Sequence, residues 1–307
     1  MRLPRLIRPP LARLLRSLPV RGRWRLAPML NRLFPAESVE AVLPETGPIR
    51  LDLADEDQLQ IYWTGLHPDD ARIVRLVRDV LPPDGVFVDV GANVGIHTLA
   101  AARHLAAGGG TVTAFEPHPH NYRTLNDNIA RQGWRHVTAH NFGLAEAPQT
   151  LTCQGPTPGG NWSLASRGGY AFTVRLVRLD DFLEANPLPR LDLMKIDVEG
   201  AEVRVLRGAG RTLSRFRPLI AFEVAPAWLR RLQTSPAELL ATLEEFGYVI
   251  HRLPADGPPQ RAPRVTAADL AGMGPGDWTN LVAVPPVGGD RPAERTPVTE
   301  DHGWART

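Results

Sequence analysis

The sequence predicts an α/β protein built on a doubly wound, mostly parallel β-sheet with helices on both faces. Three observations support this class. Strand-like apolar runs alternate with helical runs about every 25 residues from residue 86 onward. The first run, VFVDV at 86–90, is apolar enough to be covered on both faces. Polar residues gather where the runs end, which is the edge at which open α/β sheets bind ligands.

The individual elements follow from hydrophobic periodicity and from the glycines and prolines that interrupt it. Residues 49–55 alternate like a strand, and 68–80 has the spacing of an amphipathic helix that ends before Pro82. Residues 202–216 are helical but broken at Gly208 and Gly210. The segments 248–252 and 280–284 are expected to form an antiparallel pair of strands at the end of the sheet. Further strands are expected at 86–90, 111–115, 136–142, 191–196 and 219–224, and further helices at 97–107, 118–131 and 236–246.

The 307 residues divide into three parts by composition. Residues 1–48 form a basic appendage, 49–286 the catalytic domain, and 287–307 a proline-, glycine- and charge-rich tail expected to be disordered. We expect the appendage to be a loosely ordered leader. The alternative is that LARLL and MLNRLF form short amphipathic helices, whose arginines would touch a membrane surface or an acidic partner.

Charge and cysteine content indicate which partners and which cell compartment to expect. Residues 1–36 carry nine arginines and no acid, so the rest of the chain is net acidic and nucleic acid is not an expected partner. The one cysteine, Cys153, excludes an intrachain disulfide, which suits a reducing compartment, and we expect the cytoplasm. No apolar run approaches the roughly 20 residues that a membrane span requires. The oligomeric state is not indicated.

A glycine-spaced turn follows the first strand of the sheet. Gly91 and Gly95 bracket it, Asp89 precedes it and Asn93 lies within it. Dinucleotide sites have three glycines as G-x-G-x-x-G, whereas this pattern suits a ligand with an amino-acid moiety and no pyrophosphate. S-adenosylmethionine is such a ligand, and an NAD-dependent oxidoreductase is the disfavoured alternative.

The ends of the next two strands supply the other half of this predicted cofactor site. Glu116 lies about 20 residues after the turn, where a carboxylate can accept both ribose hydroxyls of an adenosine. Asn141, Phe142 and Gly143 end the third strand, where an adenine ring could lie against backbone. The segment 154–170 breaks the strand–helix rhythm. It is either a lid or binding loop or a disordered hairpin connection.

The segment KIDVEGAE places reactive groups at a fourth strand end. Lys195, Asp197 and Glu199 alternate, so in extended backbone they point to one side. Asp197 is the first candidate for accepting a proton from an acceptor hydroxyl. Lys195, a single lysine among 35 basic residues, could pair with a carboxylate or act as a base if burial lowers its pKa. Glu199 could instead be structural, like Glu202.

Three further candidates rank lower. His97, His118 and His120 lie near the predicted site in sequence and are alternative bases. Oxygen ligands for a metal could come from Asp197, Glu199, Glu223 and Asn280, but no His/Cys cluster supports zinc and no metal is expected.

Four blocks of this chain resemble a known family. VFVDVGANVGIHTLAAA, AFEPHPHNYRTLNDNI, VRLDDFL and LDLMKIDVEGAEVRVLRGA are similar to successive motifs of the FkbM family of S-adenosylmethionine-dependent methyltransferases, over roughly residues 50–285. The resemblance implies a Rossmann-like sheet of seven strands, the last antiparallel, and O-methylation of a hydroxyl on a sugar, glycan or polyketide. It also implies that Asp89, Gly91, Asn93 and Gly95 hold the methionine part, that Glu116 holds the ribose, and that Asp197 lies nearest the transferring methyl group.

Two classes of function remain open. The first is a cofactor-dependent O-methyltransferase acting on a small molecule or glycan. The second is a non-catalytic Rossmann-like binding or scaffold protein that docks through its basic leader.

Overall fold

A computed structural model describes residues 3–17, 23–34, 37–155, 164, 166, 168–254 and 258–286. The central element is a seven-stranded sheet in the order β11-β12-β10-β9-β3-β4-β5. Its strands are β3 (Val86–Val90), β4 (Thr111–Phe115), β5 (Val137–His140), β9 (Leu193–Ile196), β10 (Leu219–Val224), β11 (Val249–Arg252) and β12 (Thr279–Val284). β12 runs antiparallel to both of its neighbours, β10 and β11, and the other adjacent strands of this sheet are parallel. The predicted fold class, with its antiparallel final pair, is confirmed.

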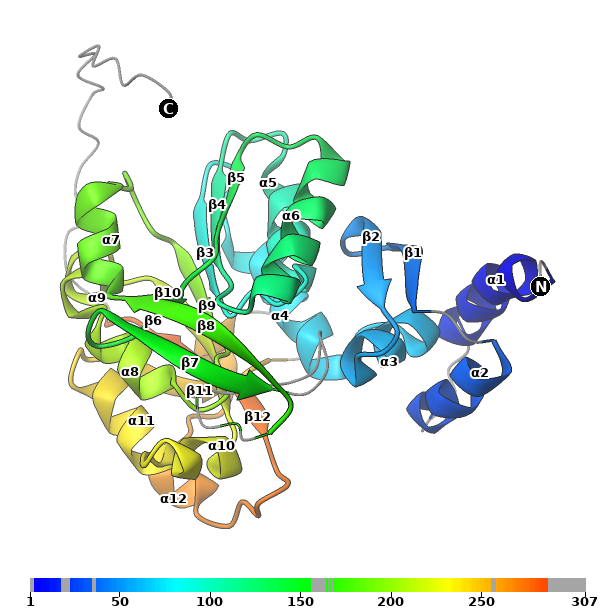
Figure 1. The fold of residues 1–307 in the computed structure, drawn as a ribbon. Helices are drawn as coiled ribbons and strands as arrows, with labels where there is room; N and C mark the ends of the chain where they lie inside the picture. The colour runs from blue at the N-terminus through cyan, green and yellow to red at the C-terminus, as the bar shows by residue number, and fades with distance from the viewer. Residues whose placement is uncertain are drawn as a thin grey trace.

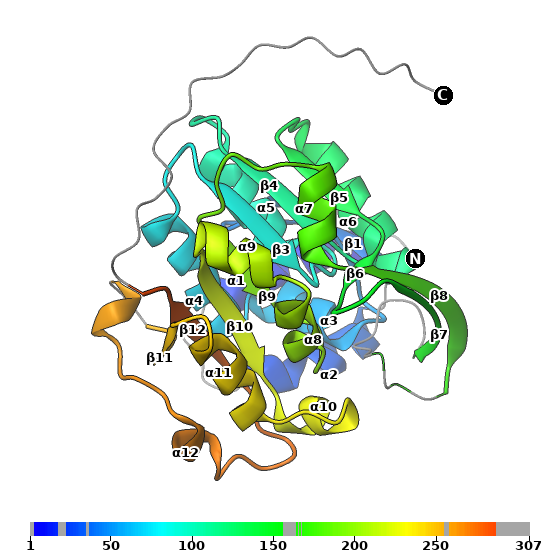
Figure 2. The ribbon, with the colours of Figure 1, turned by 90° about the vertical axis from the view of Figure 1, so that its left-hand side faces the viewer.

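Helices cover both faces of the sheet (Figures 1 and 2). Phe87, Leu193 and Val282 pack on one face against α4 and α5, and α6 extends this layer beside β4 and β5. Val88, Ile196 and Phe222 pack on the other face against α7, α8, α9 and α11. The bounds are α4 (Pro68–Val80), α5 (Ile96–Leu105), α6 (Pro119–Gln132), α7 (Leu179–Ala185), α8 (Glu202–Arg207), α9 (Gly210–Phe216), α10 (Pro226–Arg231), α11 (Pro236–Glu244) and α12 (Ala267–Leu270).

The order of the strands fixes where a ligand site can form. From β3 the chain proceeds outward through β4 to β5, and then returns to β9 on the other side of β3. The crossovers therefore leave β3 and β9 in opposite directions, and a crevice opens between their carboxyl ends. Asp89 pairs with Lys195 in the β3–β9 register. The glycine turn and the KIDVEG segment thus lie side by side.

The N-terminal segment projects from the sheet domain and is regular in its described parts (Figure 1). It contains α1 (Leu3–Ser17), the 3₁₀ turn η1 (Arg23–Leu26), α2 (Ala27–Leu33), the hairpin β1 (Ser38–Leu43) and β2 (Gly47–Asp52), and α3 (Glu56–Thr64). Our expectation of a loosely ordered leader is wrong for these residues. α1 contains Pro9 and Pro10, which disfavour a helix, but Ala12 is fully buried and Arg16 donates to the Tyr62 carbonyl at 2.7 Å. Packing on α3 therefore outweighs the proline penalty.

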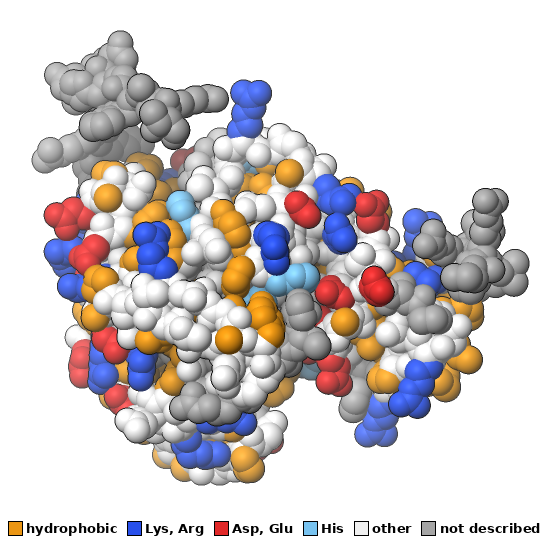
Figure 3. Space-filling view, viewed as in Figure 1, with side chains coloured by type: hydrophobic (Ala, Val, Ile, Leu, Met, Phe, Trp, Pro, Cys, Tyr) orange, Lys and Arg blue, Asp and Glu red, His pale blue; other side chains and the backbone are white. Residues whose placement is uncertain are grey.

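The N-terminal hairpin also crosses the expected domain boundary. β1 and β2 pair from Ser38–Asp52 to Leu43–Gly47, so the division between residues 48 and 49 falls inside a hairpin. Its buried Leu43 and Leu51 share a cluster with Leu99 of α5 and Leu125 of α6. Basic side chains lie on the surface of this segment near α2 (Figure 3). None of the described helices is both long and apolar enough to cross a membrane.

A small second sheet, in the order β6-β8-β7, flanks the irregular middle segment. It comprises β6 (Gly143–Leu144), β7 (Gln149–Gly155) and β8 (Tyr170–Val177). The strand-like runs on either side of the glycine- and proline-rich segment thus pair with each other. Most of that segment lies outside the described residues, including 156–163, and so does the tail from 287 onward.

Candidate active site

A cavity of about 1120 Å³ opens at the carboxyl ends of β3, β4, β9 and β10. Seven of the predicted site residues line it: Gly91, Asn93, Glu116, Gly143, Lys195, Asp197 and Glu199. Three others, Asp89, Gly95 and Asn141, do not line the cavity. Their predicted role in holding the cofactor stays a prediction.

The glycine turn owes its shape to close backbone packing. Gly91 has φ +80, and a Cβ there would overlap the carbonyl oxygen of Asp197 at the end of β9. Its N–H and that of Ala92 both donate to the Phe115 carbonyl at 3.0 Å. Gly95, with φ +100, begins α5 and leaves room for Leu125. Gly91 therefore permits the approach of β3 to β9, and Gly95 permits the packing of α6 on α5.

Glu116 is held rigidly at the end of β4. Its Oε2 accepts from the Asn93 amide and its Oε1 from the His118 amide, both at 2.8 Å. Asn141, although exposed, donates to the Glu116 carbonyl at 3.0 Å and so braces the same bend. Burial raises the pKa of Glu116 to about 7, although both amide hydrogen bonds oppose this shift. This carboxylate has acceptor capacity to spare and faces the cavity.

Lys195 joins the two strands at the crevice. Its Nζ lies 3.1 Å from Asp197 Oδ2 and 3.8 Å from Asp89 Oδ1, and it donates to the Gly91 carbonyl at 3.1 Å. Burial alone would lower the pKa of Lys195, but Asp197 and Asp89 outweigh it and raise the pKa above its usual value. Of the two roles left open for Lys195, the geometry favours the charged partner of carboxylates over the base.

The loop after β9 leads from Glu199 to Glu202, and these two glutamates have different contacts. Glu202 Oε1 accepts from the amides of Val198 and Gly200, so this residue closes the loop. Glu199 has φ +53, an uncommon left-handed conformation, and lines the cavity. At Gly200, with φ +98, a Cβ would overlap the Trp228 backbone, so glycine lets α10 close against the loop. Glu202, rather than Glu199, has the structural contacts.

The cavity wall at β10 and β12 has side-chain oxygens that lack hydrogen-bond donors among the described residues. Glu223 and Asn280 are direct partners in the β10–β12 register, and both line the cavity. Within the described part of the chain, Glu223 Oε2 and Asn280 Oδ1 are buried without a hydrogen-bond partner. Burial, reinforced by Asp197 and Glu199, raises the pKa of Glu223 well above its usual range.

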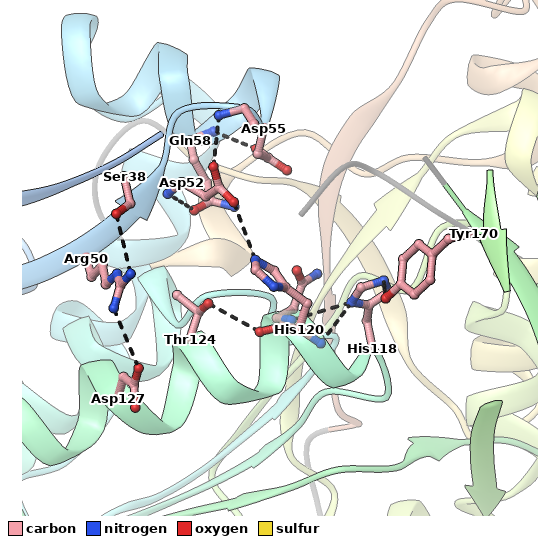
Figure 4. A network of polar contacts seen from close by, with 12 residues as sticks. Ser38, Arg50, Asp52, Asp55, Gln58, His118, His120, Thr124, Asp127 and Tyr170 are labelled. Atoms are coloured by element: carbon pink, nitrogen blue, oxygen red, sulfur yellow. Dashed lines mark hydrogen bonds and ion pairs between the residues drawn. The ribbon is translucent and has the colours of Figure 1, made fainter. Parts of the chain in front are cut away.

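The histidines serve mainly to connect elements. His118 Nδ1 accepts from the amides of His120 and Asn121 at the start of α6, and its Nε2 lies 3.2 Å from the Tyr170 hydroxyl. Burial lowers the pKa of His118 to about 4, so the ring is neutral near pH 7. His120 Nε2 lies 3.4 Å from Asp52 Oδ2 on the hairpin, as Figure 4 shows.

His97 differs from the other two histidines because it lines the cavity. It is buried, and its Nε2 lies 3.5 Å from Asp70 Oδ1. Burial lowers its pKa well below the usual value, with Lys195 adding to the effect.

Sequence reasoning missed the part of the wall that comes from outside the sheet. Asp57 on α3, Asp70 on α4, Trp228 on α10 and Trp278 before β12 all line the cavity. Trp278 lies 4.9 Å from His67, measured between ring centroids. One signal was available for α3: Asp55 followed by Gln58 is a helix-capping pattern, and the Asp55 carboxylate accepts from the Gln58 amide at 2.8 Å.

The donor set fits S-adenosylmethionine better than a metal ion. No group of three or more His, Cys, Asp or Glu residues that could hold a metal is found in the described ranges. Asn93 Oδ1 is buried at the cavity without a partner among the described atoms, and acidic side chains outnumber Lys195 along the wall. A ligand with a ribose, an ammonium group and a sulfonium supplies the hydroxyls and positive charge that these groups lack.

A doubly wound sheet with an antiparallel β12, a glycine turn after β3 and an acid at the end of β4 defines the Rossmann-like methyltransferase class. The Methyltransferase FkbM domain matches residues 89–250, more than half of the chain. The chain belongs to the FkbM methyltransferase family.

Three relatives illustrate the extent of the similarity. Methyltransferase 1 of Beauveria bassiana is 34% identical over 149 residues, covering 41% of this chain and 59% of that protein. Hexuronic acid methyltransferase AglP of Haloferax volcanii is 28% identical over 144 residues, covering 46% and 56%. The 31-O-demethyl-FK506 methyltransferase FkbM of Streptomyces tacrolimicus is 30% identical over 166 residues, covering 42% and 60%. The chain thus spans little more than half the length of each of these relatives.

Proposed function

We propose that this protein is an S-adenosylmethionine-dependent O-methyltransferase that acts on a hydroxylated small molecule or glycan. The observation that carries the proposal is the pairing of Glu116, clamped by two backbone amides, with the Lys195–Asp197 pair across one cavity. The name of one relative specifies a 31-O-demethyl substrate, which supports oxygen as the methylated atom, and the name of another specifies a hexuronic acid, which supports a sugar-like acceptor. The single buried cysteine suits a cytoplasmic enzyme.

The cofactor half of the site would bind through groups already in place. Glu116 would accept the ribose hydroxyls, and the Gly91–Asn93 turn would bind the methionine end. When bound, S-adenosylmethionine supplies an electrophilic methyl group on a sulfonium. The cavity walls would align the acceptor oxygen with that methyl, and positioning of this kind can contribute roughly 7–11 kcal/mol to lowering a barrier.

Asp197 is the group best placed to receive the proton that leaves the acceptor hydroxyl. Its side chain is 31% exposed and lines the cavity, whereas that of Asp89 is fully buried. Lys195 would hold Asp197 in position and keep the region from accumulating unpaired negative charge. Lys195 itself stays protonated because its pKa is raised.

Calorimetry with S-adenosylhomocysteine tests the cofactor assignment. Glu116→Ala is expected to weaken binding by about tenfold to a hundredfold, because a charged hydrogen-bond acceptor is worth roughly 1.5–3 kcal/mol. Glu244→Ala, an exposed change on α11, is the matched control and should bind normally. Absence of binding by the unmodified protein would overturn the proposal.

Turnover of labelled S-adenosylmethionine with fractionated cell extracts tests the enzymatic assignment. Asp197→Asn is expected to lower the rate of methyl transfer by about 10²–10⁴-fold, the usual contribution of a general base. The affinity for S-adenosylhomocysteine should stay within a few-fold of that of the unmodified protein. Intact cofactor binding without turnover on any fraction would instead favour the non-catalytic binding protein.

A further inference from the structure

The cavity wall formed by β10 and β12 presents two acceptor groups side by side. Glu223 and Asn280 face each other in the antiparallel register, where paired Cβ atoms lie about 4.5–5.5 Å apart. Both side chains line the cavity. Because Lys195 pairs with Ala221 in the β9–β10 register, Glu223 lies two residues further toward the cavity edge on the same face of the sheet. The pair is therefore separate from the Lys195–Asp197 contact but opens into the same space.

The two acceptors lack donors among the described residues. Asn280 is only 7% exposed, and neither its Oδ1 nor Glu223 Oε2 has a hydrogen-bond partner in the described part of the chain. A buried acceptor without a donor costs about 1–3 kcal/mol. A ligand that donates to both side chains would remove this cost.

The charge around this wall restricts the charge of a ligand that could bind there. Within the described ranges, no lysine or arginine comes within 4.0 Å of the carboxylate of Glu223 or Glu199. Burial and the neighbouring carboxylates of Asp197 and Glu199 raise the pKa of Glu223 well above its usual range, and Lys195 offsets this only in part. An anionic ligand would add to the repulsion, and a neutral one would leave it unchanged.

An ammonium group supplies both the hydrogen-bond donors and the positive charge that this wall lacks. It carries three N–H donors and no acceptor, so it can bond Glu223 and Asn280 together. It also supplies the positive charge that the buried carboxylates lack. Trp278 lines the same cavity and offers an aromatic face, which attracts cations at close range, whereas the Arg231 guanidinium already lies 4.2 Å from the ring centroid of Trp228.

We propose that Glu223 and Asn280 form an acceptor subsite that binds a protonated amine, so that the methyl acceptor is an amino alcohol such as an amino sugar. This inference rests on the proposed methyltransferase function and specifies its substrate class. The amine is anchored at β10 and β12, while the hydroxyl that receives the methyl group lies toward Asp197.

Three two-carbon probes that differ in charge test the subsite directly. Ethanolamine, ethylene glycol and glycolate are titrated against the full chain in the presence of S-adenosylhomocysteine, and binding is followed by saturation-transfer NMR. We expect ethanolamine to bind with a dissociation constant below about 100 mM, a realistic limit for so small a ligand, and the other two to bind at least about tenfold more weakly.

Two substitutions assign the binding to the proposed residues. Glu223→Gln, which keeps shape but removes charge, and Asn280→Leu, which removes the acceptor oxygen, should each weaken ethanolamine binding about tenfold. Glu244→Gln makes the same charge change on an exposed turn of α11 and should have no effect. Circular dichroism and thermal melting confirm that each variant is folded, and the isosteric Glu223→Gln keeps the test valid if Asn280→Leu does not fold.

The outcomes separate this inference from the broader function. Equal binding of the three probes, no ethanolamine binding, or ethanolamine binding unaffected by Glu223→Gln would overturn the subsite while leaving the methyltransferase proposal intact. Loss of S-adenosylhomocysteine affinity in Glu223→Gln would also overturn it, because the pair would then belong to the cofactor. Failure of the unmodified protein to bind S-adenosylhomocysteine at all would overturn the proposed function itself.

Discussion

The two walls of the cavity differ in how their principal charged groups are held, although buried oxygens without a hydrogen-bond partner among the described residues occur in both, such as Asn93 Oδ1 after β3 and Asn280 Oδ1 on β12. At β3, β4 and β9, Glu116 accepts from two backbone amides and Lys195 contacts two carboxylates and a carbonyl. At β10 and β12, Glu223 Oε2 and Asn280 Oδ1 have no partner among the described residues. The first wall is preorganised, as suits a cofactor that is the same in every turnover. The second has the oxygen atoms that we propose to bind the methyl acceptor.

The difference is also one of backbone packing. The first wall depends on chain segments that touch at glycines, so its geometry leaves no room for adjustment. The second is completed by side chains of α3 and of the segment before β12, which are distant in sequence. Substitutions should therefore be most damaging in the first wall and progressively milder toward the second.

Gly91→Ala should have the largest effect. A methyl group would overlap the Asp197 carbonyl, and φ +80 is unfavourable for alanine, so we expect the free energy of unfolding to fall by about 4 kcal/mol or more. Urea unfolding measures the loss. Gly109→Ala is the matched control: its φ is +83 but no atom lies within 4 Å, so only about 1 kcal/mol should be lost. Equal losses would show that contact with β9 does not matter.

Lys195→Met should have the second largest effect. It removes the cation that faces Asp89 and leaves this fully buried carboxylate with the Thr98 hydroxyl as a donor but without its ionic partner, which costs about 3–5 kcal/mol. Lys195→Arg retains the charge but cannot place a compact ammonium against the Gly91 carbonyl, so turnover should fall more than cofactor affinity. Denaturant unfolding, calorimetry and labelled-methyl transfer separate these effects. Full activity of Lys195→Arg would mean that any buried cation suffices.

Glu202→Gln should have a smaller effect that depends on pH. Burial raises the pKa of Glu202 to about 7, with Asp197 adding to the shift against the opposing backbone hydrogen bonds. The folded state therefore holds this proton more tightly than the unfolded state, and stability is lost as pH rises from about 4.5 to about 7. The amide oxygen of glutamine can still accept from Val198 and Gly200, so the substitution removes only the titration.

Unfolding measured across this pH range gives the expected comparison. Above pH 7 the Glu202→Gln variant should be more stable than the unmodified protein by up to about 3 kcal/mol, and near pH 4.5 the two should converge. Glu244→Gln, on the exposed side of α11, should follow the unmodified curve. A constant offset at every pH would attribute the change to packing rather than to the proton.

The contrast between the walls also explains what could be predicted from the sequence. Strands 111–115 and 219–224 and helix 68–80 coincide with β4, β10 and α4, because buried parallel strands and amphipathic helices have clear periodicities. The residues of the first wall follow strand ends directly, so their neighbourhood follows from topology alone. Asp89 and Asn141 were placed at the correct edge, but whether a side chain faces the cavity depends on packing.

The second wall and the N-terminal segment could not be read in the same way. Trp278 and Asp57 belong to segments whose position is set by tertiary contacts rather than by a local pattern. α1 contains two prolines that a local rule treats as helix breakers, yet its contacts with α3 stabilise it. The predicted domain boundary after residue 48 followed a change of composition, which does not show that the strands on either side of the 44–46 turn pair with each other.

Trp278→Ala should have the smallest effect on the fold and the most selective effect on function. Trp278 is 43% exposed and contacts His67, so the free energy of unfolding should fall by less than about 1 kcal/mol. Because it lies in the second wall, S-adenosylhomocysteine affinity should stay within about twofold. The apparent KM for an active extract fraction should rise several-fold, since an aromatic face at the acceptor side is lost. The exposed Leu33→Ala on α2 serves as a control for loss of a surface apolar group. Weaker binding of S-adenosylhomocysteine with an unchanged KM for the acceptor would mean that Trp278 belongs to the cofactor side of the cavity.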